Sequence, residues 1–217
     1  MDAGLRLAAD LGGERSARLL VLAVPLGGVL TGAALASDLG AELDAVFVRK
    51  LRHPLRPEHT VGAIAEDGRV ELNPPADDRT GVSADHLRDE HHRRWEELDR
   101  IRSAVRRVRP PAEPGGRPVI VVDDGVDTGA TLRAALRVVR SRRPGRLVVA
   151  VPVATAERLS ELEGLCDRVV CTHRPITRTP FSAHYDDFGR VSVEQVVRYL
   201  RAATHRYAAV TTRPERV

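Results

Sequence analysis

The feature that most constrains the fold is an apolar run, an acidic pair, a glycine-rich loop and a helical pattern in immediate succession. Residues 119–122 (VIVV) are typical of a buried parallel strand. Asp123 and Asp124 follow, then the loop 125–131, and then a helical pattern over 132–139. Because unpaired backbone N–H groups and the helix dipole both point at such a loop, it predicts an anion site. The two acids add acceptors for sugar hydroxyls or for a hydrated metal ion.

Two other phosphate-binding loops fit this stretch poorly. A Walker loop needs a Lys before its final Ser/Thr, and Ala130 stands there. A dinucleotide-binding loop needs G-x-G-x-x-G, and Gly125 and Gly129 are spaced wrongly for it. The remaining alternative is an ordinary strand-to-helix turn with two solvated acids, but such turns rarely combine acids and phosphate loop in this way.

Length and composition predict one soluble domain that spans residues 1–217. Hydrophobic residues make up 42% and charged residues 29% of the chain, as in ordinary globular proteins. No apolar run approaches the ~20 residues of a membrane span, and the N-terminus lacks the apolar core of a signal peptide. Cys166 and Cys171 lie in one short segment, which argues against a disulfide framework. We therefore expect a cytoplasmic protein that does not bind membranes.

The net charge of +4 and the sequence pI near 9.6 could indicate a nucleic-acid partner. However, Lys50 is the only lysine among 34 basic residues, which suggests a GC-rich genome. The high pKa of arginine then raises the pI without a special basic patch. A nucleic-acid partner is thus not the favoured interpretation, and anionic substrates suit the charge.

Alternating strand and helix patterns predict an α/β fold: a mostly parallel twisted sheet with helices on both faces. Ligands bind such sheets beyond the carboxyl ends of the strands. Besides the central motif, the patterns predict strands over 18–24, 43–48, 147–153 and 167–172, helices over 2–11, 29–39, 83–108, 154–162 and 193–203, a loop over 49–59, a hairpin over 61–72, an irregular segment over 173–191 and a frayed tail from Tyr207.

Residues 119–131 resemble the phosphoribosyl-pyrophosphate (PRPP) motif of the type I phosphoribosyltransferases. Residues 21–51, 59–73 and 180–196 resemble a little-characterised bacterial branch of that family. The resemblance implies transfer of 5-phosphoribosyl from PRPP to a nitrogen acceptor, usually a nucleobase, with release of pyrophosphate and help from Mg²⁺. It also implies a flexible flap over about 49–72 and a small hood over about 173–191.

By this resemblance, Asp123 and Asp124 are catalytic, hold the ribose hydroxyls and organise Mg²⁺, mainly through substrate and water. Asp127 is the third catalytic candidate: it either faces the acceptor and moves a proton, or it stabilises the start of the following helix. The 5′-phosphate is expected to bind the backbone amides and hydroxyls of Gly125, Val126, Thr128, Gly129, Ala130 and Thr131.

The loop after the first strand resembles the family's pyrophosphate loop, with Leu26, Gly27 and Gly28 as binding candidates; a plain strand-to-helix turn is the alternative. Relatives often carry Arg or Lys where Leu26 stands, so one cation is missing here. A strained or cis peptide is common in this loop. Arg49 and Lys50 either pair with pyrophosphate oxygens or form a solvated basic pair.

Residues 58–66 are expected to close over the site, with Glu66 as a further candidate for contact. In the hood, Tyr185 is the candidate acceptor-binding residue, with Phe181 and Phe188 beside it. Aromatic rings there either sandwich a planar base or pin the irregular segment onto the sheet.

Two other functions remain open. A non-catalytic regulator that senses PRPP and binds RNA or DNA would explain Leu26 and the high pI. An amine in place of a nucleobase would suit an acceptor site whose motifs are weak. The long helix predicted over 83–108 could also pair with its copy in a homodimer.

Overall fold

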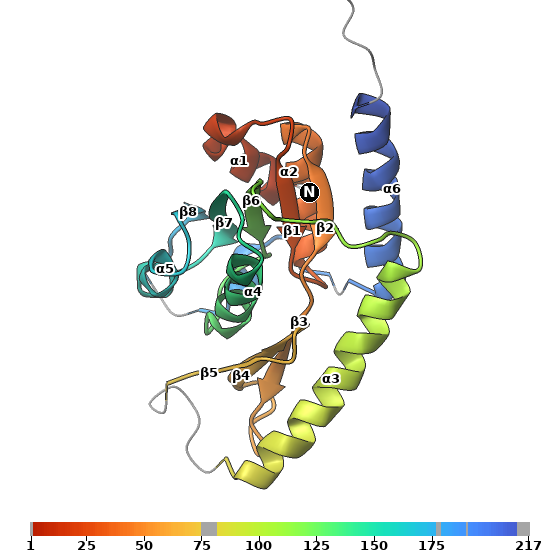
Figure 1. Ribbon diagram of the computed structural model, residues 1–217. Helices are drawn as coiled ribbons and strands as arrows, with labels where there is room; N and C mark the ends of the chain where they lie inside the picture. Colours follow the sequence, from red (N-terminus) through yellow and green to blue (C-terminus); the bar gives the residue numbers. More distant parts are fainter. Residues whose placement is uncertain (1, 75–81, 177–178, 190, 212–217) are drawn as a thin grey trace, which may run out of the picture.

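The computed structural model describes residues 2–74, 82–176, 179–189 and 191–211. Figure 1 shows a twisted sheet with helices on both sides and a second, smaller sheet below it. In chain order the elements are α1 (Asp2–Asp10), η1 (Gly12–Glu14), β1 (Leu20–Ala23), α2 (Gly28–Leu39), β2 (Glu42–Ala45), β3 (Val48–Arg52), β4 (Thr60–Ala65), β5 (Val70–Leu72), α3 (Ala84–Arg106), β6 (Pro118–Val122), α4 (Ala130–Ser141), β7 (Arg146–Val153), α5 (Ala156–Glu163), β8 (Arg168–His173), η2 (Phe181–His184) and α6 (Val193–Thr211).

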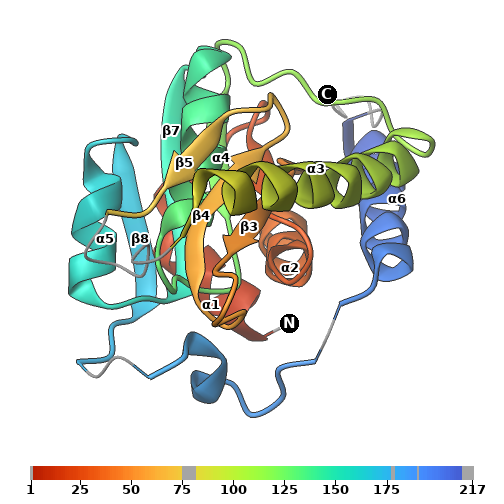
Figure 2. The same ribbon diagram turned by 90° about the horizontal axis from the view of Figure 1, so that it is seen from below.

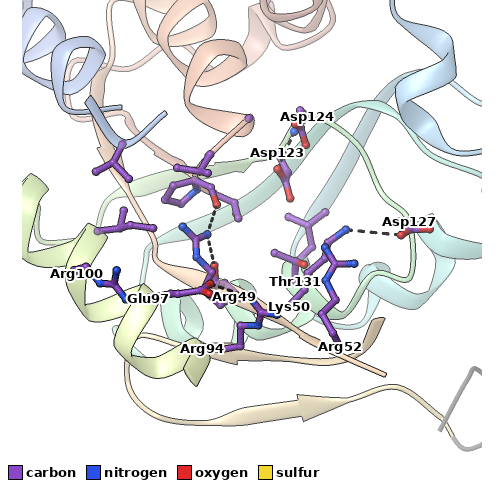
Figure 3. Close-up of a pocket in the computed structure, with 18 of the residues that line it drawn as sticks. Arg49, Lys50, Arg52, Arg94, Glu97, Arg100, Asp123, Asp124, Asp127 and Thr131 are labelled. Carbon is purple, nitrogen blue, oxygen red and sulfur yellow. Dashed lines mark hydrogen bonds and ion pairs between the residues drawn. The ribbon is translucent and has the colours of Figure 1, made fainter. Parts of the chain in front are cut away.

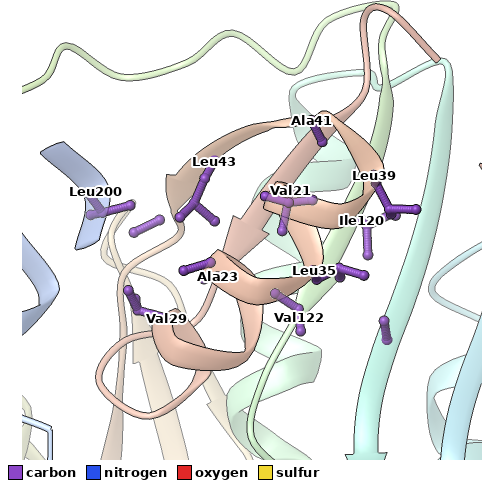
Figure 4. Close-up of a cluster of buried hydrophobic side chains, with 14 of the residues drawn as sticks. Val21, Ala23, Val29, Leu35, Leu39, Ala41, Leu43, Ile120, Val122 and Leu200 are labelled. Carbon is purple, nitrogen blue, oxygen red and sulfur yellow. The ribbon is translucent and has the colours of Figure 1, made fainter. Parts of the chain in front are cut away.

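The main sheet has five parallel strands in the order β2-β1-β6-β7-β8, which confirms the predicted α/β architecture. Strand residues alternate between two cores, as period-2 geometry requires. Val21 and Ile120 face α1, α2 and α6, whereas Leu22 and Val121 face α4 and α5. Figure 4 shows α2 lying against the first of these cores, with Leu200 of α6 at its edge.

The second sheet is antiparallel, in the order β3-β4-β5, and it corrects two expectations. The strand predicted over 43–48 ends at Ala45, and 48–52 form a separate strand where a loop was expected. The reason is a side-chain contact from far along the chain: the Phe47 N–H donates to the Glu66 carboxylate at 3.1 Å, so the chain leaves one sheet and joins the other. The predicted hairpin is confirmed as β4 and β5.

The predicted flap is therefore a packed sheet in this structure. Every residue of β4 is buried, against α3 on one side and α4 on the other. Figure 2 shows β3, β4 and β5 beneath the long helix α3. The sheet and α3 together build a wall opposite the main sheet.

Helix α3 begins where the sequence predicts, because the Ser83 hydroxyl accepts a hydrogen bond from the His86 N–H at 3.1 Å. Its second half packs on the core through Leu98, Ile101 and Val105. The buried Asp44 carboxylate accepts two hydrogen bonds from the Arg106 guanidinium, at 2.8 and 3.0 Å. This charge pair fixes α3 against β2.

The C-terminal helix departs from expectation. Helix α6 continues to Thr211, past Tyr207, where a frayed tail was predicted. The Tyr207 hydroxyl donates to the Ala17 carbonyl at 3.2 Å, a contact that no local pattern reveals. In the hood, residues 177–178 and 190 lie outside the described part. None of the described helices is long and apolar enough to cross a membrane.

We predict that Asp44→Asn destabilises the protein by about 3 kcal/mol, because it leaves the Arg106 charge without its buried partner. Asp99 is the matched control: it pairs with Arg102 on α3 and is 46% exposed, so Asp99→Asn should cost less than about 1 kcal/mol. Urea unfolding of the three proteins measures both values. Equal losses in the two variants would contradict the assignment of Asp44 as the anchor of α3.

Candidate functional site

A cavity of about 990 Å³ lies beyond the carboxyl ends of β1 and β6. Its walls come from the loop after β1, from β3, from α3, from residues 123–129 and 131–132, from Phe181 of the hood and from the start of α6. Figure 3 shows the acid pair between Asp127 on one side and Arg100 of α3 on the other. This is the position at which parallel sheets bind ligands.

The acid pair is held by the close approach of two loops. A Cβ on Gly27 would lie 1.7 Å from an Asp124 carboxylate oxygen, and one on Gly28 would lie 2.9 Å from the Asp123 Cα. A side chain at position 27 would therefore displace the Asp124 carboxylate, and one at position 28 would collide with the Asp123 backbone. The Asp123 carboxylate also accepts the Asp124 N–H at 2.9 Å.

Burial of both carboxyls raises their pKa values. Asp123 is 9% exposed, and its pKa is raised well above the usual range by burial and then by the charge of Asp124. Burial likewise raises the pKa of Asp124. In the described part of the chain neither carboxylate has a salt-bridge partner within 4.0 Å, so the pair lacks close neutralising charge. A ligand that brought positive charge here would be stabilised strongly.

The loop 125–131 is shaped for an anion. Gly129 caps the N-terminus of α4 in a left-handed conformation, with φ of +76°, and this end of the helix lines the cavity through Thr128, Gly129 and Thr131. The Val126 N–H is already used, because it donates to the Val153 carbonyl at 3.0 Å. Ala130 is fully buried and does not line the cavity.

Arg133 of α4 holds this loop from behind. Its guanidinium donates to the Thr128 carbonyl at 3.1 Å, to the Glu161 carboxylate at 2.6 Å and to the Asn73 side chain at 2.7 Å. The arginine is 8% exposed. It therefore ties the loop to α5 and to the end of the small sheet.

The predicted pyrophosphate loop contains a cis peptide between Pro25 and Leu26. Leu26 and Gly27 line the cavity, whereas Gly28 is buried behind the acid pair. The Leu26 side chain also packs against the core next to α2, as an apolar residue does.

Both basic candidates of β3 line the cavity and already have partners, as Figure 3 shows. The Arg49 guanidinium donates to the Pro25 carbonyl at 3.1 Å and to the Val48 carbonyl at 3.2 Å, and burial lowers its pKa. Lys50 Nζ lies 3.7 Å from Asp127 Oδ2. Asp127 thus faces the small sheet, an arrangement that neither sequence-based alternative anticipated.

The hood reaches the site from the other side. The Tyr185 hydroxyl donates to the Asp124 carbonyl at 2.6 Å, and burial raises its pKa, which keeps it a donor. Tyr185 does not line the cavity, whereas Phe181 does and packs directly on Gly125. Phe181 and Phe188 meet edge to face at 5.4 Å. In this structure the aromatic residues pin the hood onto the acid loop.

Glu66 was a candidate for direct contact, and the structure places it elsewhere. Its carboxylate accepts from the Phe47 N–H and from Arg142, and its side chain is 7% exposed. It is a structural acid at the junction of the two sheets.

Sequence reasoning missed the whole α3 wall. Arg94, Arg100 and Arg107 line the cavity, together with Arg52 of β3. The signal was present as arginines among the polar residues of a long helix, but only the small sheet beneath α3 shows which face meets the cavity. A helical charge pattern alone is typical of a solvated surface.

The chain belongs to the family described as the phosphoribosyl transferase domain, whose model matches residues 2–187. Two curated relatives from Mycobacterium tuberculosis are each 35% identical over 207 residues, 95% of this chain; one is named "Putative phosphoribosyl transferase Rv0571c". The chain spans about half (47%) of the length of these relatives. The crystal structure of TT1426 from Thermus thermophilus superimposes with a TM-score of 0.73 at 39% identity, covering 92% of this chain and 95% of that one.

We predict that Asp123→Asn raises the melting temperature of the ligand-free protein by a few degrees at pH 8. The native state holds the Asp123 proton more tightly than the unfolded state, so wild-type stability falls as pH rises from the ordinary value of 3.8 through the raised pKa. An asparagine carries no such penalty. Melting curves at pH 8 and near pH 4 should therefore show a larger difference at pH 8; an equal difference at both would contradict the prediction.

We predict that Arg133→Met destabilises the protein by roughly 3 kcal/mol, because it leaves the buried Asn73 side-chain oxygen and the Thr128 carbonyl without this donor, although Glu161 keeps its pair with Arg158. Arg137, on the same helix, pairs with Glu71 and is 53% exposed. Arg137→Met should cost under about 1 kcal/mol in the same urea titration. A cost for Arg133→Met as small as that of the control would show that the network contributes little.

Proposed function

We propose that the protein transfers the 5-phosphoribosyl group of PRPP to a nitrogen acceptor, a nucleobase in the first instance, with release of pyrophosphate. The observation that carries the proposal is the acid pair Asp123–Asp124, set between the loop 125–131 and the loop 25–28 in one cavity. These three features match the three parts of PRPP: the loop 125–131 suits the 5′-phosphate, the acid pair suits the ribose hydroxyls, and the loop 25–28 suits the diphosphate. The family membership supports the same reaction class.

The donor set fits Mg²⁺. Two buried carboxylates with raised pKa values offer the hard oxygen ligands that Mg²⁺ prefers. Among the described residues no cluster of three or more acidic, His or Cys side chains could hold a metal alone, so substrate oxygens and water would complete its coordination. Bound Mg²⁺ would supply positive charge to the departing diphosphate.

The protein's own residues orient the substrate and stabilise the charge that develops on it during the reaction. The carboxylates of Asp123 and Asp124 accept hydrogen bonds from the ribose hydroxyls and orient the anomeric carbon. Amides of residues 127–131 and the hydroxyls of Thr128 and Thr131 bind the 5′-phosphate. As the anomeric carbon loses its bond to pyrophosphate, the carboxylates stabilise the positive charge that develops on the ribose ring.

Phe181 packs on Gly125 and is the aromatic residue of the cavity lining in the described part of the chain. An aromatic wall suits a planar acceptor, which favours a nucleobase over an aliphatic amine. Asp127 would act as the proton acceptor only after its ion pair with Lys50 opens.

The test is pyrophosphate release from PRPP, with Mg²⁺ and a panel of nucleobases and amines, next to calorimetry with PRPP and Mg²⁺. We expect binding that depends on Mg²⁺ and turnover with at least one base. Asp124→Asn should lower turnover by about 10²-fold or more. Asp38→Asn, an exposed acid outside the cavity, is the control and should retain full activity.

No binding of PRPP and no turnover with any acceptor would refute the proposal. Binding without turnover, together with salt-dependent affinity for RNA or DNA that PRPP alters, would favour the regulatory alternative.

A further inference from the structure

Two arginines of the cavity differ from their neighbours on the long helix. Arg100 of α3 and Arg107, which caps the helix, have no acidic partner within the described ranges. The other arginines of α3 are all paired: Arg88 with Asp85, Arg93 and Arg94 with Glu90, Arg102 with Asp99, and Arg106 with Asp44. Arg94 also lines the cavity but is paired with Glu90 and Glu97, which leaves Arg100 and Arg107 as the two arginines of this wall without an acidic partner among the described residues.

The spacing places the two side chains on one wall. Seven residues are two helical turns, so the Cα atoms lie about 10 Å apart along the axis, within reach of two long side chains that converge. Ser103 and Ala104 stand between them and line the cavity with small side chains. Figure 3 shows Arg100 at the end opposite Asp127. The wall between the arginines therefore has room for a ligand.

The charges on this wall favour an anion. Glu97 is paired with Arg94, and Asp99 with Arg102. Glu194 of α6 and Glu96 of α3 also line the cavity; a hydrogen bond from Ser192 lowers the pKa of Glu194, and Glu96 lies 3.3 Å from His92. Against these two carboxylates stand the guanidinium groups of Arg52, Arg100 and Arg107, none of which has an acidic partner among the described residues, so the lining keeps a positive surplus.

The loop 25–28 has no cation of its own. Leu26 is apolar, the Arg49 guanidinium is bound to the Pro25 carbonyl, and Lys50 faces Asp127. A diphosphate beside this loop carries at least two negative charges. The lining guanidinium groups without an acidic partner in the described part of the chain are those of Arg100 and Arg107 on the α3 wall and that of Arg52 on β3, which donates to the Glu58 carbonyl.

The geometry points to Arg100 and Arg107 as the side chains that bind the diphosphate of PRPP, in place of a cation on the loop 25–28. This inference rests on the proposed function and extends it to the leaving-group subsite. The two arginines make no covalent bond: they bind the diphosphate oxygens in the substrate and hold the pyrophosphate as its bond to the anomeric carbon breaks.

Calorimetry of the full chain with Mg²⁺ tests this with two probes, inorganic pyrophosphate and ribose 5-phosphate. The double variant Arg100→Gln/Arg107→Gln should bind pyrophosphate at least tenfold more weakly, with ribose 5-phosphate affinity within twofold of wild type. The charge-matched control is Arg6→Gln/Arg88→Gln, two exposed arginines outside the cavity, which should match wild type for both probes. Circular dichroism confirms that each variant is folded.

A rescue variant distinguishes loss of positive charge at the site from distortion of the fold as the cause of weaker pyrophosphate binding. Adding Leu26→Lys to the double variant returns a cation to the loop and should recover at least part of the lost pyrophosphate affinity. Unchanged pyrophosphate binding in the double variant overturns the inference, and so does an equal loss for both probes. A wild type that binds PRPP but shows no effect of these substitutions leaves the proposed function standing, whereas a wild type that binds neither PRPP nor pyrophosphate refutes both.

Discussion

The structure depends first on the contact between two turns that have no room for a side chain between them. Gly27 and Gly28 lie against Asp124 and Asp123, so the loop after β1 and the loop after β6 meet at backbone distance. This contact buries the carboxyls and raises their pKa values, since water is excluded from around them. The same contact places the first residue of α2, Gly28, directly behind the acid pair. A single methyl group at Gly27 would displace the carboxylate on which the proposed chemistry depends.

The second constraint is the position of α3 and the small sheet, which turn an open sheet edge into a cavity. Asp44 fixes the second half of α3, and the buried Glu90 fixes the first half by accepting from Arg94 and from the Arg52 N–H, at 2.7 and 2.9 Å. Burial alone would raise the pKa of Glu90, but these hydrogen bonds and the charges of Arg94 and Arg93 outweigh it and leave the pKa below its ordinary value. The wall opposite the acid pair is thus held by two buried carboxylates: Glu90 in the first half of the helix, and Asp44 of β2, which binds Arg106 at its C-terminal end.

The main sheet and its helices were predictable because each rests on local pattern. Residues 119–122 read as a buried strand, and Gly40 ends α2 as a left-handed cap. The passage of the chain from the main sheet to the small sheet near Phe47 was not predictable, since it depends on the Glu66 carboxylate, 19 residues away. For the same reason the charged stretch at Arg49 looked like a loop although it is a strand.

At the site, sequence reasoning identified which residues meet but not how they are used. The acid pair, the anion loop and the loop at Leu26 come together as expected. The partners of Arg49, Asp127 and Tyr185 could not be predicted, because each bonds to a group far along the chain. The α3 wall was missed because its role comes from a sheet that no local pattern placed beneath it.

The Arg133 network has a mechanical consequence. One guanidinium bonds to the Thr128 carbonyl and to Asn73, the residue that follows β5. Buried bonds of this kind are stiff, so a displacement of the small sheet cannot leave the Thr128 peptide where it was. Lys50 belongs to that sheet, and its ion pair with Asp127 is a second contact between the sheet and the loop 125–131. The small sheet and the loop 125–131 are therefore coupled directly to each other, while the hood is attached to the acid pair separately through Tyr185.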